Sequence, residues 1–365
     1  MATTNFGVNS PQAVKLWSRK LFREALKRTW FYKFMGKGSD SLIQIAEDTS
    51  KGPGDRVRVT LRMLLSGAGI SGDGTLEGNE ESLSVYSDDV LIDQLRHAVR
   101  SGGKMSEQRI PFSVREEARQ GLTDWWADRI DAWCMNQLAA NAAVNDTKYT
   151  GNQAITAADS SHIFYGAVGS GHTDQGLVIS SGASASNSLK LNMIDNLVMR
   201  AKTLSPQIRP IRANGKDHYV MFVHPEQVYD LRNDGLSANG TVTSWSDIQR
   251  AAVQGGQVEN NPLFTGALGV YNGVILHEST RVPRTFTSSA TITGGRIAVF
   301  CGAQAGTVAF GRGFGPGRMS WVEELFDYKN QLGVSAGLIA GVKKNVFNSA
   351  DFGVLTQVTS VTNGT

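Results

Sequence analysis

The spacing of apolar and polar residues changes several times along the chain, and each spacing predicts a different element. From Arg56 to Arg62 apolar and polar side chains alternate with a period of two, which is typical of a half-buried strand. A stretch rich in glycine and acids follows at 67–81, and apolar positions return at 83–85 and 90–99. This pattern predicts a long hairpin. Because a two-stranded arm is marginally stable alone, we expect a partner surface to support it.

A long helix is predicted after the hairpin. Ser113 to Glu116 has the sequence of a capping box, and apolar residues then recur mainly at steps of three and four. The stripe consists of Ala118, Leu122, Trp125, Trp126, Ile130, Trp133, Cys134 and Leu138. The predicted helix runs from residue 113 to about residue 142, on the order of 45 Å at 1.5 Å per residue.

Another amphipathic helix is predicted near the N-terminus, where Ser10 and Pro11 form a helix start. Its apolar stripe consists of Val14, Trp17, Leu21, Ala25 and Leu26. Positions 15–37 hold eight basic residues and one acid. Such a helix can dock on a neighbouring subunit or lie on an anionic membrane, and the pattern leaves both alternatives open.

The rest of the chain divides into three patterns. Residues 142–187 are rich in Asn, Thr, Gly and Ser and predict an irregular insertion with an ordered patch at 163–165. Residues 188–310 predict a compact α/β unit, and residues 304–358 predict further strands. In the α/β unit we expect helices at 191–201, 225–231 and from Ser244, and strands at 219–223, 274–276 and 296–301.

Composition and charge narrow the class of protein. The 365 residues are 41% hydrophobic and 19% charged, which is ordinary for a globular protein with a large core. The net charge is only +3, from 36 basic and 33 acidic residues. This balance argues against a dedicated nucleic-acid-binding protein, whose affinity depends on neutralising phosphates. No run of 18 apolar residues predicts a transmembrane helix, and no apolar segment near the start predicts a secretory signal.

The chain offers no constellation of catalytic or metal-binding residues. Cys134 and Cys301 lack metal-ligand spacing and are expected to be reduced core thiols. No two of the six histidines are three or four positions apart. The run GRGFGPG at 311–317 fits neither a dinucleotide-binding nor a P-loop motif. We therefore predict no catalytic, cofactor or metal site, and an enzyme of unknown type stays as the alternative from another class.

The order of these elements, together with several short segments, resembles a known family. The segments are 22–34 (FREALKRTWFYKF), 54–57 (GDRV), 221–227 (MFVHPEQ), 266–277 (GALGVYNGVILH) and 333–344 (GVSAGLIAGVKK). They are similar to the major capsid proteins of tailed phages, in particular one family found among podophages, which have the HK97-like fold. The resemblance implies an α+β protein with an N-terminal arm (1–50), an E-loop hairpin (51–105), a P-domain with a spine helix and polar insertion (106–187), an A-domain (188–310) and terminal strands that return to the P-domain (311–365).

The resemblance also implies a function. The chain is expected to assemble, in the host cytoplasm, into pentamers and hexamers of an icosahedral virion shell that encloses double-stranded DNA without reading its sequence. Its expected partners are further copies of itself, a scaffolding protein, a portal protein and, as a further candidate, a decoration protein. No cofactor and no membrane are expected. The alternatives are a tail-tube or decoration subunit, and a protein that binds membranes through its basic N-terminal helix.

The predicted subunit interface lies on the arm and the hairpin. Its candidate residues are Trp17, Leu21, Arg23, Arg56, Arg58, Arg62, Asp88 and Asp89. The arginine face and the aspartates can also pair across the two strands of the hairpin. Since no lysine occurs between Arg56 and Arg100, we expect no cross-link through an E-loop lysine of the kind that some relatives form. We also expect a separate scaffolding protein and little processing of the N-terminus.

Overall fold

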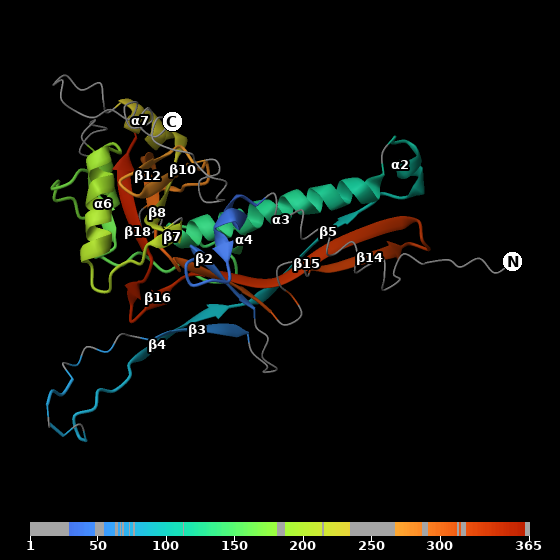
Figure 1. Cartoon of the computed structure of the whole chain (residues 1–365). Coiled ribbons are helices and arrows are strands. Elements are labelled where there is room, and N and C mark those ends of the chain that lie inside the picture. Colours follow the sequence, from blue (N-terminus) through green and yellow to red (C-terminus); the bar gives the residue numbers. More distant parts are fainter. Residues whose placement is uncertain are drawn as a thin grey trace.

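The computed structural model contains two large β-sheets joined by one long helix, and a two-stranded hairpin that projects away from both (Figure 1). The structure describes residues 29–47, 55–111, 113–180, 187–233, 267–286, 291–311, 314 and 319–361, apart from residues 63, 64, 66, 68, 73, 76, 112 and 214. The arm residues Trp17, Leu21 and Arg23, and the helix predicted from Ser244, lie outside the described residues.

The long helix α3 (Val114–Leu138) is the predicted spine helix. Ser113 is its N-cap residue, but only the Ser113 carbonyl accepts hydrogen bonds, from the amides of Glu116 and Glu117 at 3.1 Å. The predicted capping box is therefore not formed. The helix also ends earlier than predicted, because Ala140 has a left-handed backbone with φ 53°.

A six-stranded sheet runs alongside α3 (Figure 1). Its strands, in spatial order, are β1 (Met35–Gly36), β2 (Ile43–Glu47), β13 (Gly306–Phe310), β15 (Gln331–Lys344) and β14 (Ser320–Phe326), with β5 (Asp93–Arg100) also paired to β15. β15 is 14 residues long and pairs antiparallel with β5, β13 and β14. The helix α3 packs on β15, so the strand and the helix together form the extended part of the molecule.

The α/β unit predicted at 188–310 is present as an eight-stranded sheet with helices packed against it (Figure 1). The path is β6 (Ile163–Tyr165), β18 (Val354–Ser360), β12 (Thr291–Cys301), β8 (Lys216–Val223), β10 (Val274–Glu278) and β9 (Gly269–Tyr271), with β11 (Arg284–Phe286) on β12 and β7 (Ile211–Ala213) on β8. Apolar side chains of α6 (Leu191–Thr203) and α7 (Pro225–Asn233) share one core cluster with β8, β10 and β12.

The strand pairing differs from the predicted domain division at two strands. β13, which the division assigned to the α/β unit, pairs with β2 and β15 in the sheet beside α3. β18, which was expected to return to the P-domain, pairs with β12 and β6 in the sheet of the α/β unit. Both strands are buried along their whole length, so their own sequences carry no alternation that would favour one sheet over the other.

The hairpin consists of β3 (Arg56–Arg62) and β4 (Val85–Leu91), which pair antiparallel from Arg56↔Leu91 to Arg62↔Val85. This confirms the predicted hairpin, but the returning chain is not one continuous strand. After Ile92 the chain enters β5 and leaves the hairpin for the sheet beside α3. The shorter elements are η1 (Trp30–Phe34), α2 (Lys104–Gln108), α4 (Thr147–Thr150), α5 (Gln175–Ser180), β16 (Val346–Phe347) and β17 (Ala350–Asp351).

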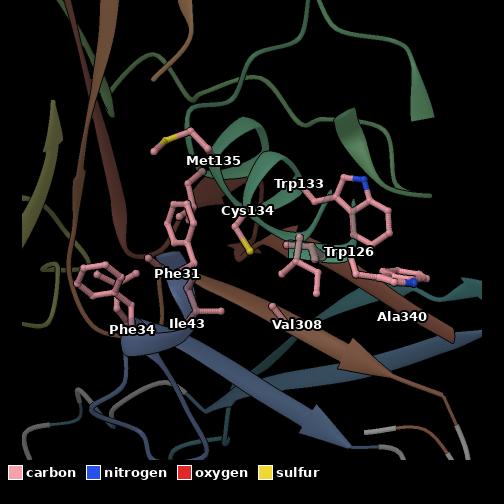
Figure 2. Packing of buried hydrophobic residues seen from close by; sticks show 14 of the residues in the cluster. Phe31, Phe34, Ile43, Trp126, Trp133, Cys134, Met135, Val308 and Ala340 are labelled. Carbon is pink, nitrogen blue, oxygen red and sulfur yellow. The ribbon is translucent and has the colours of Figure 1, made fainter. Parts of the chain in front are cut away.

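The largest apolar cluster lies where η1, α3 and the two sheets meet. Figure 2 shows Phe31 and Phe34 of η1 close to Ile43 of β2 and to Cys134 and Met135 of α3. The rings of Phe31 and Phe34 also contact Phe222 of β8 edge to face, at 5.3 and 5.2 Å between centroids. Two phenylalanines from the second half of the predicted arm (1–50) therefore help to hold the spine helix, the first sheet and the α/β unit together.

Candidate assembly interface

The arginine row of β3 is an exposed charged feature of the predicted interface. Arg56, Arg58 and Arg62 are all exposed and lie on one face of the strand, as its alternation predicted. Arg58 makes a two-pronged ion pair with Asp89 on β4, with Nε to Oδ1 at 2.8 Å and Nη2 to Oδ2 at 3.2 Å. The predicted cross-strand pairing is confirmed for this pair. The hydrogen bonds that Arg58 donates, together with its positive charge, lower the pKa of Asp89.

Arg56 and Arg62 have a different environment. Neither makes an ion pair with any residue that the structure describes. Arg56 contributes only a long-range attraction that lowers the pKa of Asp89. The hairpin thus carries two guanidinium groups whose charge is not matched within the described part of the subunit.

Asp88 points to the opposite face of β4 and serves the subunit itself. Its carboxylate pairs with the ammonium of Lys343 on β15 and accepts the backbone amide of Val346 at 3.1 Å. Lys343 also donates to the Asp89 carbonyl at 3.2 Å. Asp88 and Asp89 are adjacent in the sequence but make different contacts. Asp88 fixes the base of the hairpin to the body.

The far part of the hairpin has apolar side chains in solvent. Leu65, Leu83 and Val85 are each more than half exposed. The backbone there is held by a carboxylate, since the Gly67 amide donates to Glu81 Oε2 at 2.7 Å. An exposed apolar tip on a marginal hairpin is the kind of surface that another protein chain covers.

A second exposed apolar surface lies at the opposite end of the molecule, where β14 turns into β15. Val322, Leu325 and Phe326 are exposed on β14, and Tyr328 in the turn is fully exposed. Arg100 of β5 stacks over the Phe326 ring at 4.5 Å. We refer to these four apolar side chains as the distal patch.

Asp131 is a buried anchoring residue that sequence reasoning missed. It lies on α3, is 3% exposed, and accepts the amides of Trp30 and Phe31 at 3.0 and 3.1 Å. Burial raises the pKa of Asp131, and the two amides partly oppose that rise. The carboxylate caps the start of η1 and so fixes the point where the arm joins the body. The feature of the sequence that could have indicated this role is an acidic residue among the apolar positions of α3.

No reactive centre is evident in the part of the chain that the structure describes. Cys134 and Cys301 are completely buried, and burial raises the pKa of both thiols, which keeps them protonated. Among the described residues, no group of three His, Cys, Asp or Glu side chains could hold a metal ion. Within those same residues, no helix is long and apolar enough to cross a membrane.

Comparison with known proteins identifies the family. A family model described as phage capsid protein matches residues 5–362. The chain is 30% identical to the major capsid protein of Pseudomonas phage KPP25, over 96% of each protein. The chain belongs to the phage capsid protein family.

Solved structures agree with this assignment and decide between the structural alternatives. The capsid of Ralstonia phage GP4 superposes with a TM-score of 0.77 at 30% identity, covering 99% of this chain and 98% of the other. The capsid of cyanophage Pam1 superposes with a TM-score of 0.70 at 23% identity, covering 93% of each. The chain therefore has the predicted α+β, HK97-like fold and is a structural capsid protein of the virion, rather than a tail-tube or decoration subunit.

Proposed function

We propose that this capsid protein assembles into pentamers and hexamers of an icosahedral shell, and that the hairpin β3–β4 joins neighbouring subunits. The observation that carries the proposal is the hairpin itself, which projects from the body with exposed apolar side chains at its tip (Figure 1). A two-stranded arm gains little stability alone, so a neighbouring copy that covers it would supply what the subunit lacks.

Charge complements this argument. Arg56 and Arg62 extend from the hairpin without a carboxylate among the described residues, whereas Arg58 is neutralised by Asp89. Acidic side chains of an adjacent copy would complete the row. A contact between two different surfaces of the same chain is heterologous, and heterologous contacts generate closed rings such as pentamers and hexamers.

The distal patch provides a second self-association surface in this proposal. It lies at the end of the long strand pair β14–β15, far from the base of the hairpin (Figure 1). Contacts at both ends of an elongated subunit would extend a ring into a closed surface. The five-part division into arm, E-loop, P-domain, A-domain and terminal strands is kept, with β13 placed in the P-domain and β18 in the A-domain.

The interior of the shell would hold double-stranded DNA without sequence-specific contacts. A net charge of +3 supports enclosure rather than tight binding, because tight binding depends on many phosphate contacts. We further propose that the chain has no catalytic role, that it assembles in the host cytoplasm with a scaffolding protein and a portal protein, and that a decoration protein is a further partner.

Electron microscopy tests this function directly. The chain would be expressed alone and together with the neighbouring phage genes, and both preparations examined by negative staining. Closed shells, or rings of five and six subunits, are expected. Uniform monomers in both preparations would contradict the proposal.

Charge reversal tests the role of the arginine row. In the double variant Arg56→Glu with Arg62→Glu, two attractive contacts become repulsive at roughly 0.5–1 kcal/mol each. We expect each subunit contact to weaken about tenfold and the yield of shells in a sedimentation assay to fall. The matched control is Arg56→Lys with Arg62→Lys, which keeps both charges and should retain most of the yield. Equal yields from the two double variants would refute a role for the charge.

A further inference from the structure

The insertion between α3 and α6 forms a polar cavity that the assembly function does not use. The cavity is about 200 Å³ and lies between β6, the loop 166–172 and one side of α6. Sites for drug-sized ligands are usually larger than about 300 Å³. The size therefore suits a small ion with a few waters.

One cation lines the cavity without a carboxylate partner. Arg200 on α6 is exposed, its guanidinium lies 5.9 Å from the centre of the Phe164 ring, and it makes no ion pair with the residues that the structure describes. The single acid of α6, Asp195, is engaged elsewhere, since it accepts the Tyr271 hydroxyl at 2.8 Å and the Asn272 amide at 2.9 Å. The guanidinium is thus available to an anion in the cavity.

The loop on the other side supplies backbone donors. Gly166, Gly169 and Gly171 have left-handed φ angles of 61°, 80° and 70°, and the Ser170 amide closes a turn on the Ala167 carbonyl at 3.0 Å. Val168, Gly169 and Gly171 line the cavity, and their backbone amides donate to no acceptor among the described residues. Backbone amides presented by such turns form concave sites that bind anions.

The loop is also held firmly in place. The buried Gln357 side chain donates to the Gly166 carbonyl at 2.9 Å, and the Gly166 amide donates to the Val358 carbonyl at 2.8 Å. A side chain at Gly166 would collide with Asn187, because a Cβ there lies 2.8 Å from Asn187 Oδ1. A site fixed by such contacts is arranged before the ligand arrives, which lowers the entropic cost of binding.

Asp174 is the acid of the neighbouring loop that could compete for the guanidinium of Arg200. The carboxylate of Asp174 contributes to the raised pKa of Tyr165, after the larger effect of burial. It does not line the cavity, and its Oδ1 accepts the Leu177 amide at 2.9 Å at the start of α5. Asp174 is thus held at the start of α5 and makes no ion pair with Arg200.

We propose that this cavity is a binding site for a small oxyanion, either phosphate or a carboxylate, held by Arg200 and by the free amides of the loop 166–171. Phosphate would come from solution, and a carboxylate from an acidic side chain of another protein. The inference is independent of the role of the hairpin in assembly.

Isothermal titration calorimetry on the full-length, unassembled subunit tests this site, with sodium phosphate and sodium acetate as separate probes at constant ionic strength. We expect saturable binding of at least one probe with a Kd on the order of 1 mM. Preference for phosphate would indicate the free ion, and preference for acetate would indicate a protein carboxylate. Absence of saturable binding by both probes would overturn the proposal.

Three variants locate the site. Arg200→Gln should raise the Kd at least about tenfold, equal to about 1.4 kcal/mol. Gly169→Ala, which strains the turn without meeting any atom within 4 Å, should also weaken binding. The control Lys202→Gln removes an exposed charge from the same helix, outside the cavity, and should bind as the wild type does. If Arg200→Gln binds equally well, or Lys202→Gln loses as much affinity, the assignment is wrong. Equal thermal midpoints for the variants would show that each is folded.

Discussion

Neighbouring aspartates of β4 should differ sharply in their contribution to stability. Asp88 and Asp89 have the same side chain, but Asp88 and its partner Lys343 are only 11% and 12% exposed, whereas Asp89 and its partner Arg58 are 29% and 66% exposed. We therefore compare Asp88→Ala with Asp89→Ala, because the two changes remove the same atoms from adjacent positions.

The magnitude follows from what each change leaves behind. Without Asp88, the ammonium of Lys343 stays mostly buried and keeps only the Asp89 carbonyl at 3.2 Å, and the Val346 amide loses its acceptor. Removing one partner of a buried pair costs about 3–5 kcal/mol, and the remaining carbonyl and partial exposure reduce this to about 2–3 kcal/mol. Without Asp89, Arg58 is simply hydrated, and exposed pairs contribute roughly 0.2–1 kcal/mol.

Urea unfolding of the unassembled subunit, followed by tryptophan fluorescence, measures both free energies of unfolding. We expect Asp88→Ala to be at least about 1 kcal/mol less stable than Asp89→Ala. Asp88→Ala should also give fewer shells, since the base of the hairpin is no longer fixed to β15. Equal losses of stability for the two variants, or a larger loss for Asp89→Ala, would refute this account of the hairpin base.

Two further predictions concern the body of the subunit. Arg296 donates two hydrogen bonds to Glu226, at 2.7 and 3.1 Å, and holds the pKa of that carboxyl below its ordinary value of 4.5. The stability from this pair should be fully present above pH 4.5 and be lost as the pH falls through the lowered pKa. The difference in free energy of unfolding between wild type and Glu226→Gln should therefore shrink in acid. A constant difference down to pH values well below 4.5 would count against this account. Gly341→Ala should destabilise the subunit by more than about 2 kcal/mol, because an added Cβ would collide with the Leu91 carbonyl oxygen. Gly121→Ala, in open space on α3, should instead stabilise it by about 0.5–1 kcal/mol. Thermal unfolding of both variants measures this contrast, and equal midpoints would contradict it.

Helices and strands of this fold could be predicted from the sequence where one face of the element is buried and the other is exposed to solvent. The alternation of Arg56–Arg62 gave the correct strand, and the apolar stripe after Ser113 gave the correct start of α3. The end of α3 was predicted too late because alanine at position 140 does not indicate the left-handed backbone found there.

Long-range pairing could not be predicted in the same way. β15 is buried at most of its positions and pairs with β14, which directly precedes it, and with β13 and β5, which lie further back in the chain, so its composition does not say which strands become its neighbours. The same reason explains the placement of β13 and β18. Both strands are buried on both faces, so no face is marked as the one that meets the core, and their partners depend on the whole fold.

The candidate interface was predictable only in part. The sequence indicated that Arg58 and Asp89 could pair, because charges on facing strands attract. It did not indicate that Asp88 would bind Lys343, some 255 positions away, or that Asp131 would cap the root of the arm. Both contacts require knowledge of which segments meet in three dimensions.

The central claim is that the hairpin of one subunit lies on another subunit of the shell. A cryo-electron-microscopy reconstruction of the assembled particle tests it most directly. The account predicts β3–β4 lying across an adjacent copy, with Arg56 and Arg62 within ion-pair distance of that copy's carboxylates and the exposed apolar tip covered. A hairpin that contacts only its own subunit, with both guanidinium groups in solvent, would contradict the claim.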